Sequence, residues 1–419
     1  MTHAFTVTAG PRCALLLFAC AIAVACTSTT VRSVDMTPPE QATEVIPENV
    51  LLDVGVAVFD ANIPEDYDEQ VEANVAPEIR RAEGNYIAYF MKNLLQTTGQ
   101  WGAVRVIPRP THAVDVVVAG RILHSDGERL QVEVTVTDAT GTTWFTKAYE
   151  ALGSRYAYEP TVPRDIDPFQ SIYKSVADDM LAYRREMSEG DIARVRTVAE
   201  MRFAQDFAPD AFGDYVVENR KGIQELERLP AESDPMLARV RRVREREYLF
   251  IDTLDEYFSD FHRNMYTPYQ DWRRATFDEA LAYRELKAQA KSRAVAGAVA
   301  IAAGAAGTFG SDETIVQAAG IAGMAAGAIT LKSAIDKSAE AKIHSEVLQE
   351  LGVSAEAEIT PHTIDLENQT VRLTGTVDAQ YQALRGILRR IYYEEMGLAV
   401  PDEPAPASTP SDQDVANPG

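Results

Sequence analysis

The densest group of side chains able to bind a metal or to move a proton lies on one predicted helix. Its members are Asp252, Asp255, Glu256, Asp260 and His262. Asp252, Asp255 and Glu256 fall within one helical turn of each other. His262 lies two turns beyond Asp255, roughly 10 Å along the helix axis. That separation favours a solvated acidic face over a coordination site or an acid–base pair.

The sequence contains none of the short motifs that carry well-known catalytic chemistry. It has no P-loop, no Gly-x-Ser-x-Gly nucleophile turn and no dinucleotide fingerprint after a strand. The histidines beyond the N-terminal segment are too scattered to form a metal-binding pair: His112, His124, His262, His344 and His362. We therefore predict a binding or structural protein that is not an enzyme and that needs no metal or cofactor.

Cys26 stands at the end of an N-terminal export signal. Arg12 precedes the apolar run Ala14–Ile22, which is too short to span a bilayer, and the small residues Ala23–Ala25 follow it. This pattern resembles the lipobox of bacterial lipoproteins, although Ala23 stands where that family prefers Leu. The resemblance implies that Cys26 is lipidated and becomes the first residue of the mature chain. The alternative is an ordinary signal peptide that is cut near Ala25.

The residues after Cys26 predict how the mature chain is held. The stretch Thr27–Pro47 is polar and contains prolines, which is typical of a tether. In lipoproteins of this kind, a neutral residue such as Thr27 after the cysteine resembles the signal for sorting to the outer membrane. The resemblance therefore implies a lipid-anchored protein at the outer membrane that faces the periplasm.

Cysteine content and charge exclude several kinds of partner and cross-link. The other two cysteines, Cys13 and Cys20, lie in the signal peptide, so the mature chain has no internal disulfide. The formal net charge is -23 at pH 7. Such a chain repels nucleic acid and anionic lipid head groups, so neither is a predicted partner.

Residues 48–186 predict one mixed α/β domain. Alternating Leu and Val side chains in Leu51–Phe59 indicate a strand with one face in the core. A helical stripe from Ile87 to Leu95 ends at Gly99, and a final helix begins at Asp167 and Pro168. Between the two helices we predict four strands: Val104–Ile107, Val114–Leu123, Leu130–Thr137 and Thr143–Tyr149. The predicted order is strand, helix, four strands, helix.

This domain resembles a periplasmic domain of several envelope proteins. The resemblance rests on Asp115–Leu123, Arg129–Asp138, Gly141 and Trp144–Tyr149. The family includes the curli secretion lipoprotein CsgG, the N-terminal domain of TolB, PelC and LpoB. It implies a non-enzymatic part of the envelope, either a ring-forming export factor or an activator of a cell-wall synthase. The short turns between these strands have no room for the pore-forming hairpins of CsgG, so we do not predict a β-barrel of that kind.

Residues 187–290 predict a helical domain. An apolar stripe runs along one helix until Pro268, and it is either core or a docking face for a partner helix: Leu254, Tyr257, Phe258, Phe261 and Met265. A basic run precedes it: Arg239, Arg241, Arg242, Arg244 and Arg246. These arginines form either a solvated face paired with nearby acids or a contact surface for an anionic partner.

Residues 291–334 are unusually rich in Ala and Gly. Two uncharged segments, Ala294–Gly310 and Thr314–Leu331, flank a short polar turn. Their glycines recur at spacings that allow close helix packing: Gly297, Gly304, Gly307, Gly320, Gly323 and Gly327. Three interpretations stay open: a membrane-inserted helical hairpin, a tightly packed soluble or oligomer-lining hairpin, and a Gly/Ala linker. The segment resembles the glycine zippers of small envelope lipoproteins, which favours a homo-oligomer.

Residues 335–398 predict a small α+β module. It comprises a helix, two strands and a second helix: Ile335–Leu351, Ala357–Ile364, Val371–Val377 and Tyr381–Tyr393. The stretch Asn368–Val377 resembles the BON domain of envelope proteins, and the alternative is a plain ββα cap. The Pro- and Ser-rich residues 399–419 predict a disordered tail.

Taken together, the sequence predicts an α+β protein of the cell envelope. The first functional hypothesis is an oligomeric lipoprotein that serves an outer-membrane export, secretion or surface-assembly system with other envelope proteins. The alternative is a lipoprotein that reaches through the periplasm to activate a cell-wall synthase. The short predicted tether favours the first hypothesis over the second.

Overall fold

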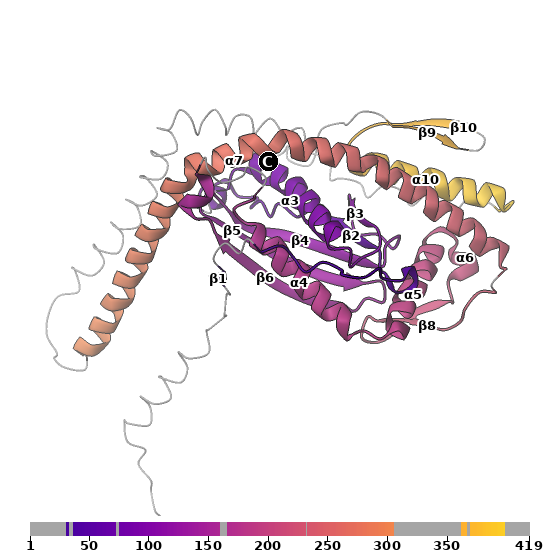
Figure 1. Cartoon of the computed structure of the whole chain (residues 1–419), viewed down its shortest axis with the longest axis horizontal. Helices are drawn as coiled ribbons and strands as arrows, with labels where there is room; N and C mark the ends of the chain where they lie inside the picture. The colour runs from indigo at the N-terminus through magenta and orange to yellow at the C-terminus, as the bar shows by residue number, and fades with distance from the viewer. Residues whose placement is uncertain are drawn as a thin grey trace, which may run out of the picture.

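The computed structural model describes residues 31–32, 37–72, 75–159, 166–231, 233–305, 362–366 and 369–398. Their fold is α+β, with a mixed sheet and packed helices, as the sequence predicts (Figure 1). The signal peptide, Cys26 and the predicted tail lie outside the described residues. So do the second Ala/Gly segment and the helix predicted at Ile335–Leu351.

A six-stranded sheet forms the centre of the molecule, with the spatial order β1-β6-β5-β4-β2-β3. Strand β2 pairs in parallel with β3 and with β4, whereas β4, β5 and β6 form an antiparallel meander. The strands are β1 (Val31–Arg32), β2 (Val54–Ala57), β3 (Val104–Ile107), β4 (Val116–Ser125), β5 (Arg129–Asp138) and β6 (Thr143–Leu152). The predicted order of strands and helices in this region is confirmed.

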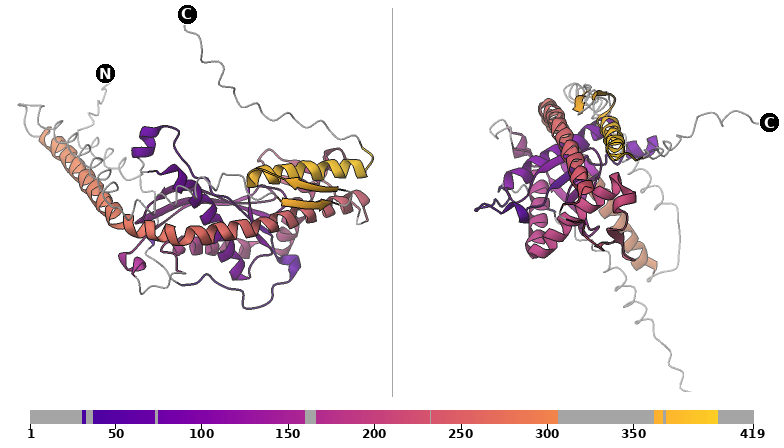
Figure 2. Two further views of the ribbon diagram at one scale, coloured as in Figure 1. Left: turned by 90° about the horizontal axis from the view of Figure 1, so that it is seen from above. Right: turned by 90° about the vertical axis from the view of Figure 1, so that its right-hand side faces the viewer.

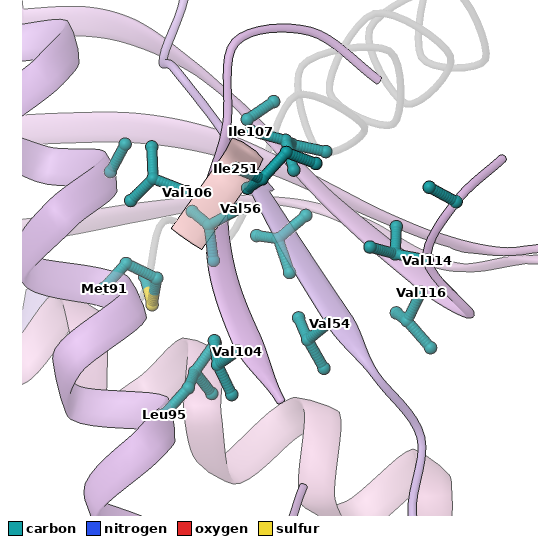
Figure 3. Packing of buried hydrophobic residues seen from close by; sticks show 14 of the residues in the cluster. Val54, Val56, Met91, Leu95, Val104, Val106, Ile107, Val114, Val116 and Ile251 are labelled. Atoms are coloured by element: carbon teal, nitrogen blue, oxygen red, sulfur yellow. The ribbon is translucent and has the colours of Figure 1, made fainter. Parts of the chain in front are cut away.

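The prediction that the first long strand has only one buried face is wrong. All four residues of β2 are buried, because β2 lies between β3 and β4 and both of its faces are covered. On one face Val54 and Val56 pack beside Met91 (Figure 3). On the other face a Cβ on Gly55 would lie only 2.6 Å from Ile107. A larger residue here would force the end of the Ile107 side chain to shift, and glycine avoids this close contact.

Helices pack on this sheet and beyond its end. Gly99 takes the left-handed conformation (φ +64°) and ends the second of them, as predicted. The helices are α2 (Tyr67–Glu72), α3 (Pro77–Thr98), α4 (Gln170–Glu186), α5 (Glu189–Phe207) and α6 (Pro209–Phe212), with short 3-10 turns η2 (Glu48–Val50) and η3 (Arg155–Tyr158). A small hairpin follows, formed by β7 (Val216–Glu218) and β8 (Gln224–Leu226). The sheet, α5 and the next helix share one continuous hydrophobic cluster, so the core has no break near residue 187.

Helix α7 (Pro235–Ala305) is 71 residues long and crosses the whole sheet domain (Figures 1 and 2). The prediction that a helix ends at Pro268 is wrong, because Pro268 lies inside α7. An interior proline removes one helical hydrogen bond and costs about 3 kcal/mol. The burial of the apolar surface of Met265 and Tyr269, on either side of Pro268, helps to offset that cost.

The C-terminal module lies along α7. Its described parts are β9 (His362–Leu366), β10 (Gln369–Leu373) and α10 (Val377–Glu395), and the two strands form an antiparallel pair. β9 runs to Leu366, past the predicted end at Ile364, whereas β10 begins at Gln369 and ends at Leu373, before the predicted end at Val377. Residues 357–361 of the first predicted strand lie outside the described residues. Figure 2 shows α10 running beside the first part of α7.

The predicted tether is only partly a tether. Residues 37–50 pack on the sheet domain: Ala42 N–H donates to the Thr98 carbonyl at 2.7 Å, and Glu40 forms an ion pair with Arg185 of α4. Upstream, β1 pairs with β6. The polar composition therefore predicts the absence of helix and strand correctly after residue 37, but it does not predict the packing.

Candidate functional site: the long helix α7 and its two anchors

The apolar stripe of α7 belongs to the hydrophobic core of this chain and is not a docking face for a partner helix. Leu254, Phe258 and Met265 are buried, and the adjoining Tyr257 is half-buried. Helix α3 supplies much of the covering surface. The stripe is therefore used within the chain and is not a free docking face.

The acidic side chains of α7 form ion pairs with neighbouring elements. Asp252 binds Arg105 of β3 at 2.6 Å, and Asp255 binds Lys92 of α3 at 2.9 Å. The ring of His262 instead packs on α3 and stacks on Tyr86 with ring centroids 4.5 Å apart. Burial lowers the pKa of His262 to about 4, so the ring is neutral at pH 7.

The remaining acids do not build a metal site either. Asp260 pairs with Arg263 one turn along the same helix. Among the residues that the structure describes, no group of three or more His, Cys, Asp or Glu side chains is arranged to hold a metal ion. Asp252 and Asp255 therefore help to hold α7 against β3 and α3. Asp260, in contrast, pairs within α7, and Glu256 is exposed.

A buried ion pair fixes α7 to the sheet domain. The Arg273 and Asp167 side chains are both fully buried, with Nη1 and Oδ2 3.0 Å apart. The same oxygen accepts from Tyr86 of α3 at 3.1 Å and from Gln270 at 3.2 Å. Asp167, which the sequence predicts as a helix cap, receives the Phe169 N–H on its other oxygen. Its main contacts are with α7.

A second carboxylate extends this pair into a network. Glu83 of α3 accepts from Tyr269 Oη at 2.5 Å and from Ser125 at the end of β4. Arg80 compensates the charge of Glu83, with Nε 3.3 Å from Oε2. Tyr269 also receives a hydrogen bond from Arg273, so the two carboxylates share one network. We call Asp167, Arg273, Tyr269, Glu83 and their partners the inner anchor.

The β4–β5 turn meets the backbone of α7 directly beside the inner anchor. A Cβ on Gly127 would collide with the Arg273 carbonyl oxygen and would lie 2.8 Å from the Phe277 nitrogen. Tyr158 donates to the Gly127 carbonyl at 2.6 Å. The Asp-Gly turn that the sequence predicts therefore also provides the close contact between the sheet and α7.

The second anchor joins α7 to the C-terminal module. Glu247 of α7 is fully buried, and Tyr381 of α10 donates to its Oε1 at 2.5 Å. Arg385 of α10 lies between Glu247, at 3.6 Å, and Asp206 of α5, at 3.1 Å. His112 binds the same Asp206 at 3.1 Å. We call these five residues the outer anchor.

Burial acts on the two carboxyl groups of the outer anchor with different results. Burial raises the pKa of Glu247 above its ordinary value, and the charge of Arg385 offsets this only in part. Burial also pushes the pKa of Asp206 upward. There, however, the hydrogen bond from His112 and the charge of Arg385 outweigh it, so the pKa of Asp206 is lowered.

One feature of the sequence could have indicated both anchors, and the sequence-based prediction missed it. Glu247 lies seven residues before Leu254 on the apolar stripe, and Arg273 lies eight residues after Met265. A charged residue at a core position of a helix needs a buried partner of opposite charge. The identity of those partners, far away in sequence, cannot be read from the stripe.

The basic run of α7 contacts other parts of this chain. Arg241 pairs with Glu200 of α5 at 2.6 Å, and Arg239 donates to a backbone carbonyl at the end of α10. Arg244 donates to the Ala113 carbonyl. Among the described residues, Arg242 donates to the carbonyl of Ala238 in its own helix. Arg246 has an interaction partner within the chain as well. The contacts that the structure shows for these arginines are therefore with other parts of the same chain.

The far end of α7 carries the start of the Ala/Gly region. The helix continues through Gly297 and Gly304 and ends at Ala305, and its last part projects away from the sheet (Figure 1). Gly307, Gly320, Gly323 and Gly327 lie outside the described residues. Within the described part of the chain, no helix is both long and apolar enough to cross a membrane. The first uncharged segment, Ala294–Gly310, is helical as far as Ala305, whereas a flexible Gly/Ala linker would not be helical.

Comparison with known proteins adds no assignment. No protein-family model, no curated protein and no solved structure matches the chain.

Proposed function

We propose that the chain is a non-enzymatic lipoprotein of the bacterial cell envelope. Cys26 carries the lipid, and the protein is held at the outer membrane facing the periplasm. It serves as an oligomeric accessory of an export, secretion or surface-assembly system, in contact with other envelope proteins. The Ala/Gly region forms the contact between copies.

The observation that carries this proposal is the way α7 leads from the sheet domain into the Ala/Gly region. The inner anchor holds α7 at Arg273, and Phe277 is the last large side chain of α7 that is described as buried. From Phe277 to Ala305 the helix rises roughly 40 Å. An anchored helix of this length presents the Ala/Gly region at a defined place away from the sheet.

The N-terminal segment supports a position close to the membrane. Val31 pairs with Glu150 of β6, and the chain is packed again from Thr37 onward. The five residues from Cys26 to Val31 reach at most about 18 Å when fully extended. This short reach favours an accessory at the membrane surface over a regulator that spans the periplasm.

The two membrane-directed features lie toward the same end of the molecule. Figure 1 shows β1 and the projecting end of α7 both toward the left of the long axis. A lipid on Cys26 and the Ala/Gly region at the end of α7 can therefore face one membrane together. This arrangement supports assembly of several copies on one surface.

The assembly half of the proposal is tested by adding bulk to the GxxxG sequence. Gly323→Leu with Gly327→Leu keeps the segment apolar but prevents close helix packing. Light scattering of the mature protein in mild detergent should show a large assembly for the wild type and a much smaller one for the variant. The control, Ala322→Leu with Ala326→Leu, adds bulk one position around the helix and should assemble normally. A wild-type monomer would contradict the proposal.

The lipid half is tested separately. Cys26→Ser removes the thiol that accepts the lipid, so labelled palmitate should be lost and the protein should leave the membrane fraction. Unchanged labelling in the variant would contradict the lipoprotein assignment. The first test measures assembly and the second measures lipidation. Each part of the proposal can therefore be contradicted independently of the other.

A further inference from the structure

A cavity of 260 Å³ opens on the sheet face opposite α3 and α4. Its walls come from the loop before β4, from β4 and β5, and from Arg202 of α5. Its volume lies just below the range of about 300–1,000 Å³ that is typical of small-molecule pockets. The cavity therefore suits a ligand of few atoms.

The lining combines aliphatic and polar side chains. Val114, Val117 and Ala119 supply aliphatic surface, whereas Thr137 and His112 supply polar groups. Mainly aliphatic walls with a few convergent polar groups are the usual composition of a small-molecule site.

Arg202 is the cation of this cavity, and few of its hydrogen-bond donors are used within the described part of the chain. Its Nη1 donates to the Ala139 carbonyl at 2.8 Å, and among the described residues its guanidinium has no other hydrogen-bond acceptor. Burial lowers the pKa of Arg202 in spite of the attraction of Asp206, Glu218 and Asp138. A guanidinium has five donors in a planar fork, so most of them are left for a ligand.

The carboxylate beside Arg202 in the cavity wall does not supply its partner. Asp138 lines the cavity, but its Oδ1 accepts from the Thr140 N–H at 2.9 Å and its Oδ2 accepts from Trp144 Nε1 at 2.9 Å. Asp206, in turn, is held by His112 and Arg385 in the outer anchor. Both acids are thus used by other donors.

His112 adds a second oriented group. Its Nδ1 lies 3.1 Å from Asp206, which makes Nδ1 the donor, so Nε2 is the ring nitrogen that this contact does not use. Nε2 accepts a hydrogen bond when the ring is neutral and donates one when it is protonated. The outer anchor therefore fixes the orientation of one wall of the cavity.

We propose that this cavity binds a carboxylate on a short aliphatic body. The carboxylate forms a two-pronged hydrogen-bonded pair with Arg202, with His112 beside it. The aliphatic part lies against Val117 and Ala119. Two sources share this chemistry: the free C-terminus of a peptide that ends in small residues, and a free short-chain acid.

Four probes separate these possibilities by isothermal titration calorimetry of the lipid-free protein. N-acetyl-alanyl-alanine presents a peptide carboxylate, and its C-terminal amide removes the charge. Isovalerate presents a free acid, and inorganic phosphate presents an anion without an aliphatic body. Binding of one or both carboxylates, without the amide or phosphate, is the expected result. Equal binding of the amide, or no binding of either carboxylate at millimolar concentration, would overturn the proposal.

Substitutions in the lining then test whether the ligand binds in this cavity. Arg202→Gln should weaken binding at least about tenfold, because it removes a charged hydrogen-bonding partner. The control Arg194→Gln changes an exposed arginine of the same helix and should bind as the wild type does. Val117→Phe fills the cavity without touching Arg202 and should also abolish binding, which guards against a folding defect in Arg202→Gln. Unchanged binding in both cavity variants would overturn the proposal.

Discussion

The inner and outer anchors hold the same helix, yet they compensate their buried carboxylates differently. In the inner anchor, both oxygens of Asp167 accept hydrogen bonds, and Oδ2 alone accepts from three side chains. In the outer anchor, Oε1 of Glu247 accepts from Tyr381 and Thr111, but Oε2 has no hydrogen bond within the described part of the chain. Arg273 is fully buried, whereas Arg385 is 19% exposed.

This difference assigns different roles to the two anchors. The inner anchor connects α3, β4 and the start of α4 to α7, so it cannot open without disturbing the core of the sheet domain. The outer anchor attaches α10, whose other contact with the sheet domain includes the exposed Arg109–Asp378 pair. We expect the C-terminal module to be released before the sheet domain unfolds.

The largest effect is expected from breaking the inner anchor. Arg273→Ala leaves Asp167 buried without its cation, which should reduce the free energy of unfolding by roughly 3–5 kcal/mol. Chemical denaturation measures this change. Arg263→Ala removes an exposed arginine of the same helix and should cost no more than about 0.5 kcal/mol. Similar losses in both variants would show that the inner anchor does not hold α7.

A smaller effect is expected where the β4–β5 turn meets α7. Gly127→Ala places a methyl group against the backbone at Arg273 and Phe277, and the enforced shift should cost about 1–3 kcal/mol. Gly190→Ala, at an open position near the start of α5, is the matched control and should be close to neutral. Thermal unfolding compares the two. A neutral Gly127→Ala would mean that α7 lies farther from the turn.

The contribution of the outer anchor to the free energy of unfolding should depend on pH. Because burial raises the pKa of Glu247, the folded protein keeps this proton to a higher pH than the unfolded chain does. Its contribution to stability is therefore complete below the unfolded pKa of about 4.3 and declines as the pH rises through the folded pKa. The groups that face it are Arg385 and Tyr381 of α10 and Asp206 of α5.

The corresponding measurement compares Glu247→Gln with the wild type between about pH 4 and pH 7. The stability of the wild type relative to this variant should fall as the pH rises. Glu245→Gln, at an exposed position of the same helix, should follow the wild type throughout. A relative stability that increases with pH would contradict the assigned direction.

The smallest effect concerns the exposed link to α10. Arg109 Nε lies 2.7 Å from Asp378 Oδ1, and both side chains are about half exposed. Arg109→Ala should therefore change the free energy of unfolding by less than about 1 kcal/mol. Limited proteolysis within α10 should be nearly unchanged, in contrast to Arg385→Ala, which should expose α10 to cleavage. Equal sensitivity of the two variants would remove the distinction between the outer anchor and this surface pair.

The local elements could be predicted from the sequence because their signals are short-range. The stripe that ends at Gly99 and the alternation around the Asp126–Gly127 turn each lie within a few residues of the element they predict. The failures at β2 and Pro268 have a different cause. Covering of both strand faces and tolerance of an interior proline depend on neighbours elsewhere in the chain.

The anchors themselves could not be predicted for the same reason. Glu83 and Tyr269 are 186 positions apart, and Glu247 and Tyr381 are 134 positions apart. One sequence contains no signal that pairs such distant residues. Glu247 and Arg273 are charged residues at core positions of the apolar stripe, so the sequence could have predicted that each has a buried partner of opposite charge. The stripe alone does not identify those partners.

We propose that the inner anchor holds α7 and the sheet domain together as one rigid unit that positions the Ala/Gly region. The most direct test is a spin-label distance measurement in a lipid-free Cys26→Ser chain, with one label at Ala148→Cys on β6 and one at Ser292→Cys near the end of α7. A rigid unit should give a single narrow distance distribution that broadens when Arg273→Ala is added. A broad distribution in the chain with Arg273 intact would contradict this proposal.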